Sequence, residues 1–227
     1  MMEMYEAGSD LRDMMALTET LLNKVAREVM GSEQLPWGEQ VISYAVPFRR
    51  LTMKDAIAQY GQIERHLLED GASVRDLARA VHIENADTKT VGTLLGDLFE
   101  HHAEKQLIQP SFITDYPIEL SPLTKSLEGD DGFVDRFEMF IGGMELANAY
   151  SELNDPMEQL GRFQAQMAER ESGNDEAMQL DQDFITSLEH GFPPTGGEGI
   201  GIDRLVMLLT NSASIRDVIL FPLMRPM

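Results

Sequence analysis

Two carboxylates that flank a glycine pair are the first candidates for chemistry in this sequence. Glu138 and Glu145 stand on either side of Gly142-Gly143. If the glycines form a two-residue hairpin turn, Phe140 pairs with Glu145, and period-two alternation places Glu138 and Glu145 on one face. Like charges held this close favour a divalent cation with oxygen ligands, such as Mg²⁺ bridging phosphates. A solvated acidic face is the alternative.

A second set of polar residues follows on the same predicted strand. Asn148, Tyr150 and Glu152 alternate with one another but not with Glu145. They can join the same pocket only through a bulge or strand end near Ala147. If Glu152 is partly buried, its carboxylate suits a ligand that carries an ammonium group. The alternative is an exposed strand residue.

A glycine-rich segment leads into Arg204. Gly197, Gly199 and Gly201 alternate along it, which sacrifices packing and strand propensity and indicates that something flat, such as a nucleobase, approaches the backbone. Arg204 falls in the first turn of an apolar helix, where a cation opposes the helix dipole. Its guanidinium could meet a phosphate, stack on a base or form a salt bridge with a carboxylate. The glycine spacing matches neither a Walker loop nor a dinucleotide fingerprint.

Composition narrows the possible partners. The net charge is -21, with 18 Lys and Arg residues spread along 227 positions, so this chain alone should hold RNA poorly. There are no cysteines, and the five histidines show no metal-binding spacing, which makes zinc an unlikely ligand. No apolar stretch approaches the roughly 18 residues of a membrane helix, and no secretory signal is visible. We therefore expect a cytoplasmic protein with no membrane partner.

The pattern of elements predicts an α+β fold, an antiparallel sheet with helices packed against it. Helices are expected after a cap at Ser9 and ending at Gly31, from Thr52, over 73–81 and 90–104, from Asp155-Pro156, over 183–190 and from Asp203. Strands are expected as a hairpin over 34–43, at 111–114, over 133–153 around the glycine pair, and at 199–202.

The chain reads as one continuous domain with an internal division. Residues 52–108 are expected to form a helical insertion, and residues 109–227 to carry the active-site sheet. Two stretches resemble linkers, 128–132 and 171–176, and a loop is expected over 192–197.

The sequence resembles a known family at several long motifs. Residues 197–205, Gly-Glu-Gly-Ile-Gly-Ile-Asp-Arg-Leu, look like motif 3 of the class II aminoacyl-tRNA synthetases. Residues 109–117, 136–155 and 214–222 are similar to lysyl-tRNA synthetases of that class, and the resemblance covers essentially the whole chain. It implies the antiparallel sheet flanked by helices of a class II catalytic domain, incomplete on its N-terminal side.

On the nucleotide side, the resemblance implies that Glu138 and Glu145 hold Mg²⁺ with ATP, and that Arg204 binds the terminal phosphate end of the nucleotide. Arg204 and Glu145 are thereby the candidate catalytic residues. The glycines that would admit the adenosine are Gly197, Gly199 and Gly201.

On the amino-acid side, the resemblance implies that Asn148 and Glu152 line a lysine pocket, with Glu152 facing the side-chain ammonium. Residues 2–5 are similar to the end of motif 2, which places Glu3 and Tyr5 beside the substrate.

The implied function is ATP-dependent activation of lysine to lysyl-adenylate, followed by transfer to tRNA(Lys) in translation. The family's anticodon-binding domain, its motif 1 and the motif 2 loop with its phosphate-binding arginine would all precede Met1, so we expect an N-terminally truncated catalytic domain with an open sheet edge. The intact family implies a homodimer, and a separate polypeptide could supply the missing part. The alternatives are a noncatalytic lysine- or ATP-binding remnant, half of a split synthetase, or a paralogue that lysylates a protein.

Overall fold

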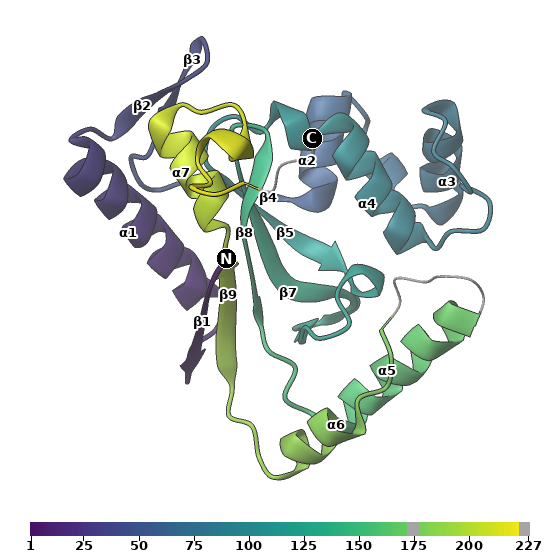
Figure 1. Cartoon of the computed structure of the whole chain (residues 1–227). Helices are drawn as coiled ribbons and strands as arrows, with labels where there is room; N and C mark the ends of the chain where they lie inside the picture. The colour runs from purple at the N-terminus through teal and green to yellow at the C-terminus, as the bar shows by residue number, and fades with distance from the viewer. Residues whose placement is uncertain (172–177, 223–227) are drawn as a thin grey trace, which may run out of the picture.

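The computed structural model describes residues 1–171 and 178–222. Its centre is a sheet whose strands follow the order β1-β9-β8-β7-β5-β4, with β6 beside β7 (Figure 1). Every pairing between these strands is antiparallel except that of β4 with β5. The strands are β1 (Met2–Ala7), β4 (Arg49–Thr52), β5 (Ser111–Pro117), β6 (Ser126–Leu127), β7 (Asp130–Ile141), β8 (Met144–Ser151) and β9 (Thr195–Ile200).

Helices surround this sheet in groups (Figure 1). The expected α+β class is therefore confirmed. A long helix lies along β1 and β9, three helices gather beyond β5, a pair projects from the far end of β8, and one follows β9. These are, in the same order, α1 (Leu11–Met30); α2 (Met53–Gly61), α3 (Gly71–Ala80) and α4 (Val91–His102); α5 (Pro156–Glu171) and α6 (Gln182–Glu189); and α7 (Ile202–Thr210).

Short elements connect these groups. The hairpin predicted over 34–43 is confirmed as β2 (Gln34–Trp37) and β3 (Gln40–Ser43). Single 3₁₀ turns are η1 (Arg65–Leu68), η2 (Glu104–Gln106), η3 (Ile118–Leu120) and η4 (Ile215–Asp217). Within the described part of the chain, no helix is both long enough and apolar enough to cross a membrane.

The first helix differs in detail from the prediction. Its N-cap is Asp10 rather than Ser9, because the Asp10 carboxylate accepts the backbone N–H groups of Arg12 and Asp13 and completes a capping box with Asp13. The Ser9 hydroxyl instead donates to the backbone carbonyl of Glu6 near the end of β1. The predicted C-cap is confirmed, since Gly31 adopts a left-handed conformation with φ 75°.

The buried face of α1 includes a polar residue, while some apolar residues of the helix remain exposed. Met15, Thr18 and Ala26 face the sheet, whereas Leu17 and Val29 are exposed. Both sets follow helical spacing, so the sequence alone does not say which of two adjacent apolar lines meets the sheet. Contact with the sheet decides which line is buried, because the Thr18 hydroxyl hydrogen-bonds to the carboxylate of Glu198 on β9.

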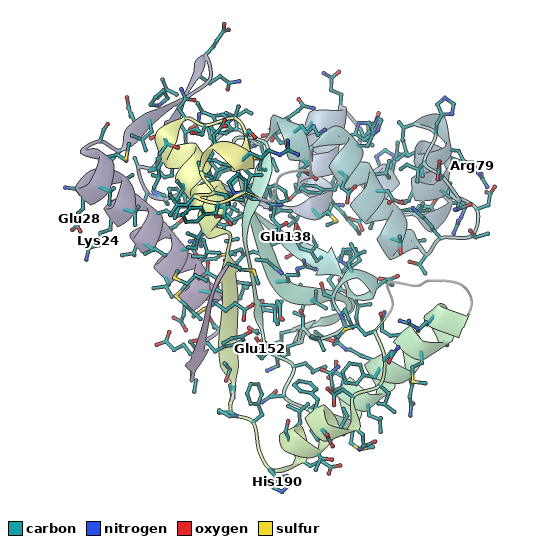
Figure 2. The ribbon with its side chains drawn as sticks, viewed as in Figure 1. Lys24, Glu28, Arg79, Glu138, Glu152 and His190 are labelled. Atoms are coloured by element: carbon teal, nitrogen blue, oxygen red, sulfur yellow. The ribbon has the colours of Figure 1, made fainter. Side chains whose placement is uncertain are left out.

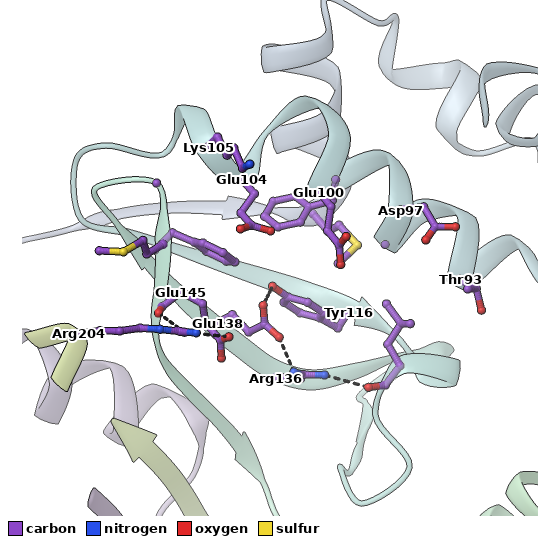
Figure 3. Close-up of a pocket in the computed structure, with 17 residues that line it drawn as sticks. Thr93, Asp97, Glu100, Glu104, Lys105, Tyr116, Arg136, Glu138, Glu145 and Arg204 are labelled. Carbon is purple, nitrogen blue, oxygen red and sulfur yellow. Dashed lines mark hydrogen bonds and ion pairs between the residues drawn. The ribbon is translucent and has the colours of Figure 1, made fainter. Parts of the chain in front are cut away.

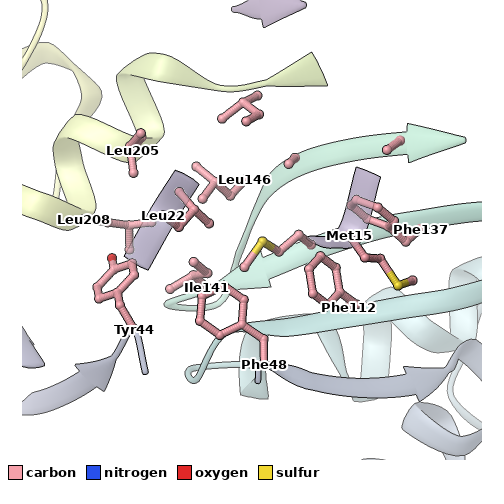
Figure 4. Close-up of a cluster of buried hydrophobic side chains, with 14 of the residues drawn as sticks. Met15, Leu22, Tyr44, Phe48, Phe112, Phe137, Ile141, Leu146, Leu205 and Leu208 are labelled. Carbon is pink, nitrogen blue, oxygen red and sulfur yellow. The ribbon is translucent and has the colours of Figure 1, made fainter. Parts of the chain in front are cut away.

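Two hydrophobic clusters hold the fold together. The first packs α1 and α7 against one face of β7, β8 and β9, and Figure 4 shows Leu22, Leu146, Leu205 and Leu208 meeting there. The aromatic rings of Phe112 and Phe137 cross edge to face within the same cluster, with centroids 4.8 Å apart. The second cluster packs α2, α3 and α4 against β5 and β7.

The helices between residues 53 and 102 lie where the helical insertion is expected, and the starts predicted at Thr52 and Thr90 are confirmed. Thr52 and Thr90 are the N-caps of α2 and α4, each accepting a backbone N–H with its hydroxyl. Strand β4 precedes α2 and pairs with β5, so these helices are tied to the sheet at both ends. The division of the chain into an insertion and an active-site sheet stays a prediction.

Three local predictions need correction, and a fourth lies outside the described residues. Residues 128–132 are not a linker: Gly129, at φ 86°, turns β6 into β7. The strand expected at 199–202 is β9, which begins at Thr195, because pairing with β1 and β8 on both sides organises glycines that have little strand propensity. The helix expected from Asp203 begins one residue earlier. The second linker-like stretch, beyond Glu171, lies outside the described residues.

Candidate functional site

The β7–β8 hairpin has the register that the glycine pair predicts. Phe140 lies opposite Glu145, and Glu138 lies opposite Asn148. Between these pairs the register shifts, because Leu146 is an extra residue on β8. The bulge predicted near residue 147 is therefore confirmed, and it brings Asn148 onto the face that carries Glu138 and Glu145.

Strand pairing extends this face across the sheet. Two rows of facing residues cross β1, β9 and β8: Glu3, Gly199 and Asn148 in one, and Tyr5, Gly197 and Tyr150 in the next. Residues on one face of a strand alternate, so both rows point to the same side of the sheet. The expected residues of the amino-acid pocket and two of the alternating glycines therefore share one surface.

A cavity of about 490 Å³ opens on this surface, here called the glycine cavity. It includes every residue expected to bind lysine and the three alternating glycines. From β1 and β8 it is lined by Glu3, Tyr5, Glu145, Asn148, Tyr150 and the adjoining Glu152, and from β9 and α7 by Gly197, Gly199, Gly201 and Arg204.

Glu152 is the least satisfied carboxylate of the glycine cavity. Its Oε1 atom is fully buried and has no hydrogen-bond partner in the described structure. Burial raises the pKa of Glu152 to about 7. The neighbouring Tyr150 is also affected: burial first, and then the charge of Glu152, raises the pKa of that phenol to about 12. A ligand that brings a positive charge would relieve this cost.

A second cavity, of about 630 Å³, lies between the helices α4 and η2 and the β7–β8 hairpin. We call it the acidic cavity because five carboxylates line it, and Figure 3 shows them facing the space. They are Asp97, Glu100, Glu104, Glu138 and Glu145.

Glu138 is held inside the acidic cavity by two side chains. The Tyr116 hydroxyl donates to its Oε2 atom over 2.9 Å, and Arg136 forms an ion pair with its Oε1 atom. Only 17% of the Glu138 side chain is exposed. Burial raises the pKa of Glu138, the charge of Arg136 opposes the rise, and the charge of Glu145 adds to it. The negative charge of Glu145 therefore reaches Glu138, and both carboxylates line the same cavity.

Glu145 and Arg204 form the boundary between the two cavities and line both. The Arg204 guanidinium lies 3.5 Å from the Glu145 carboxylate and donates to the Glu145 backbone carbonyl over 2.6 Å. The salt bridge left open by the sequence is therefore present. Both side chains remain more than 40% exposed, so the pair is weak and either member can turn to a ligand.

Figure 2 shows where residues of the site lie relative to residues at the edges of the molecule. Glu138 and Glu152 lie toward the middle of the molecule beside the sheet, whereas Lys24, Arg79 and His190 lie at its edges. Of the described residues, no group of three or more His, Cys, Asp or Glu could hold a metal ion.

Glu138 and Glu145 nevertheless suit Mg²⁺, which takes one or two carboxylates and obtains its remaining ligands from water and substrate phosphates. Each carboxylate oxygen of Glu138 retains a lone pair beyond its present hydrogen bond. The donor set therefore fits a magnesium ion that arrives with a phosphate ligand, and does not fit a metal caged by protein alone.

Two residues of the site were missed by the sequence analysis. Arg136 stands two positions before Glu138, so strand alternation alone could have placed it on the same face. Tyr116 gives no such signal, because it reaches Glu138 only through the pairing of β5 with β7. Its partner could not be identified without the fold.

The fold is an α+β domain with two adjacent cavities that share Glu145 and Arg204, one with the buried, unpaired Glu152 carboxylate beside it and one lined by five carboxylates. The family model of the tRNA synthetases class II (D, K and N) matches residues 1–225, and the chain belongs to this family.

Curated relatives narrow the comparison. The chain is 51% identical over 233 residues to a lysine–tRNA ligase of Aliivibrio fischeri and 52% identical over 234 residues to one of Vibrio cholerae. A lysine–tRNA ligase of Psychromonas ingrahamii is 50% identical over 227 residues. Each alignment covers all of this chain but only 45–46% of the relative, so the chain spans about half the length of the curated relatives it matches.

Proposed function

We propose that this chain supplies the lysine, adenosine and magnesium contacts of a lysine–tRNA ligase. The observation that carries the proposal is the buried, unpaired carboxylate of Glu152 at the glycine cavity, where an ammonium group is the missing partner. The relatives named as lysine–tRNA ligases support the same substrate. Because the chain matches about half of their length, the complete reaction is part of the proposal.

Four residues are proposed to bind lysine. Glu152 pairs with the ε-ammonium, and this pairing offsets the cost of burying its carboxylate. Asn148 offers an amide to the α-carboxyl end, while Glu3 and Tyr5 close the pocket from β1 at its open side. Gly197 leaves the space in which the Glu152 carboxylate lies, so it serves lysine binding more directly than adenosine binding.

The nucleotide side uses the boundary between the cavities. Gly199 and Gly201 leave the backbone open to the adenosine, and Arg204 turns from Glu145 to the phosphates. Glu138 and Glu145 would hold Mg²⁺ with those phosphates, and the ion when bound would neutralise phosphate charge. Arg204 and Glu145 are the proposed catalytic residues, because both touch the ligand at which charge develops.

The proposed reaction has two steps. The lysine carboxylate attacks the α-phosphorus of ATP, a new O–P bond forms, and pyrophosphate leaves with the electrons of the broken P–O bond. A ribose hydroxyl of tRNA(Lys) then attacks the carbonyl carbon of lysyl-adenylate and loses its proton, an ester C–O bond forms, and AMP leaves with the electrons of the broken C–O bond. The residues of this chain orient the lysine by its ammonium and the ATP by its phosphates, which holds the reacting atoms together.

Further partners stay proposals of the same kind. A net charge of -21 gives each copy of this chain little attraction for tRNA, so RNA contacts are assigned to another polypeptide, and the homodimer of the intact family also stays a proposal. The cytoplasmic location expected from the sequence also stays a prediction.

The test is lysine-dependent exchange between ATP and pyrophosphate by the purified chain, together with the variants Glu152→Gln and Arg204→Ala. We expect exchange in the parent chain and its loss in both variants, which also excludes a contaminating synthetase. Direct binding of lysine and of Mg·ATP is measured on the same samples. Binding without exchange would leave a noncatalytic module or half of a split enzyme, and absence of both would overturn the proposal.

A further inference from the structure

One side chain connects the residues assigned to the two ligands. Arg136 lies on β7, and only 14% of its side chain is exposed. Its Nε atom donates to Oδ1 of Asn148 over 2.9 Å, and its Nη2 atom forms the ion pair with Glu138. Asn148 belongs to the glycine cavity and Glu138 to the acidic cavity. Arg136 therefore joins a proposed lysine-binding residue to a proposed magnesium-binding residue.

The guanidinium itself is fixed and occupied. Its Nη1 atom donates to the carbonyl of Leu120 over 2.9 Å and to the hydroxyl of Ser121 over 2.5 Å. Its plane lies over the ring of Tyr116, with the guanidinium carbon 4.7 Å from the ring centroid. With all three nitrogens engaged by protein acceptors, Arg136 has little left to offer a substrate. Its effect on ligands must act through the side chains that it holds.

The contact with Asn148 decides which end of that amide meets a ligand. A guanidinium can only donate hydrogen bonds, so the oxygen of Asn148 must face Arg136. The NH₂ group then faces away from Arg136, and in the described structure no acceptor engages it. Asn148 is thereby presented to the glycine cavity as a donor, which suits a carboxylate oxygen and not an ammonium group.

The contact with Glu138 fixes the direction of that carboxylate. Tyr116 donates to one oxygen and Arg136 to the other, so the carboxylate plane is fixed from both sides (Figure 3). Without Arg136, one oxygen of Glu138 would lose its partner, and the carboxylate could rotate away from the direction in which it faces the acidic cavity.

We propose that Arg136 is a positioning residue that couples the two half-sites, presenting Asn148 to the amino acid and Glu138 to Mg·ATP through one buried guanidinium. The inference rests on the proposed function, because it assumes that lysine and Mg·ATP occupy the two cavities. It adds that the binding of lysine and the binding of Mg·ATP both depend on Arg136. Substitution of this one residue, which is not itself a ligand contact, therefore weakens the binding of both ligands.

Three variants separate this role from simple structural support. Arg136→Met removes charge and donors while keeping an apolar stem. Arg136→Lys keeps the charge but lacks the planar fork that reaches both partners. Tyr116→Phe removes only the hydroxyl that holds Glu138 and leaves Asn148 untouched. Binding of lysine and of Mg·ATP is measured by calorimetry, with thermal unfolding to verify folding.

We expect Arg136→Met to weaken the binding of both ligands by roughly 10- to 100-fold, the usual cost of losing an outer-shell partner. Arg136→Lys should restore Mg·ATP binding but not lysine affinity, because an ammonium group can pair with Glu138 without also reaching Asn148. Tyr116→Phe should weaken Mg·ATP alone. Together these outcomes would establish the coupling.

The inference fails if folded Arg136→Met loses only one ligand, or if Tyr116→Phe weakens lysine as much as Mg·ATP. If Arg136→Met does not fold, parental lysine affinity in Arg136→Lys overturns it equally. A parent chain that binds neither ligand would instead refute the proposed function, and the inference with it.

Discussion

The carboxylate of Glu152 lies in the space that a side chain at position 197 would fill. A Cβ atom built on Gly197 would stand 2.1 Å from Glu152 Oε1 and 3.1 Å from the ring of Tyr5. The backbone of Gly197 is ordinary strand, so this glycine is required for space and not for conformation. Part of the glycine pattern of motif 3 is therefore explained by a carboxylate of the same chain.

Gly197→Ala should damage lysine binding selectively. The added methyl group displaces the Glu152 carboxylate, and loss of a hydrogen-bonded charge contact costs roughly 10- to 100-fold in affinity. Binding of Mg·ATP should change little, because Arg204 and Glu138 lie outside this contact. Calorimetry with each ligand measures both effects.

Gly161→Ala is the matched control for that substitution. Gly161 lies in α5, and a Cβ atom there would meet nothing within 4 Å. It should raise the free energy of unfolding by about 0.5–1 kcal/mol through helix propensity and leave both affinities unchanged. Equal lysine affinity in Gly197→Ala and Gly161→Ala would refute the steric role of Gly197.

Lysine binding should release a proton at acidic pH. The pKa of Glu152 is raised to about 7 in the free protein, so below pH 7 its carboxyl is mostly protonated. An ammonium partner favours the ionised form, so binding at pH 6 expels nearly one proton, and binding above pH 8 expels almost none. Affinity should fall by about tenfold per pH unit below pH 7.

Calorimetry of lysine binding in buffers with different ionisation enthalpies measures this proton release directly. Glu152→Gln cannot ionise and serves as the control, with no proton release from this group and weak binding at every pH. Proton uptake, or pH-independent binding by the parent chain between pH 6 and pH 8, would show that Glu152 does not meet the ammonium.

Local alternation was enough to predict the central hairpin. A two-residue turn fixes which residues pair, so Glu138 and Glu145 fall on one face, and the wrong parity of Asn148 required the bulge that the structure contains. The sequence could therefore say where a distortion had to occur. It could do so because every step involved residues close together in the chain.

Contacts between strands and helices that are distant in the chain could not be predicted from the sequence. Tyr116 meets Glu138 only after β5 pairs with β7, and no local pattern encodes that pairing. The exposed face of α1 was likewise set by the sheet, since Thr18 is buried to meet Glu198 while the apolar Leu17 stays in solvent. Tertiary packing overrode the local apolar pattern there.

Glu198 should make the chain less stable as the pH rises. Its side chain is 3% exposed, and Thr18 is its hydrogen-bond partner while its Oε2 atom has none among the described residues. Burial raises its pKa from 4.5 to about 7, so the folded state holds this proton more tightly than the unfolded state. Stability from this group is therefore complete below pH 4.5 and is lost between about pH 4.5 and pH 7, by about 3 kcal/mol in total.

Glu198→Gln removes the titration and keeps the size of the side chain. Its free energy of unfolding should exceed that of the parent chain at pH 8 and match it near pH 4. Urea unfolding of both proteins at the two pH values measures the difference. A variant less stable than the parent at pH 8 would mean that the ionised carboxylate is satisfied in the folded chain.

Arg204→Ala should weaken the binding of Mg·ATP and leave the free energy of unfolding almost unchanged. The Arg204–Glu145 pair is weak because the two side chains are 47% and 41% exposed, so its loss should alter the free energy of unfolding by less than about 0.5 kcal/mol. Affinity for Mg·ATP should nevertheless fall by at least about tenfold, because a guanidinium bound to phosphate forms charge-assisted hydrogen bonds.

Lysine affinity, measured without nucleotide, is the internal control for Arg204→Ala. It should stay at the parental value, because Glu152 and not Arg204 carries the charge contact with the amino acid. The hydrogen bond from the Arg204 guanidinium to the backbone carbonyl of Glu145 is also lost in this variant, so thermal unfolding is followed in parallel. A large drop in stability with unchanged Mg·ATP affinity would make Arg204 a clamp on the β7–β8 hairpin instead of a nucleotide contact.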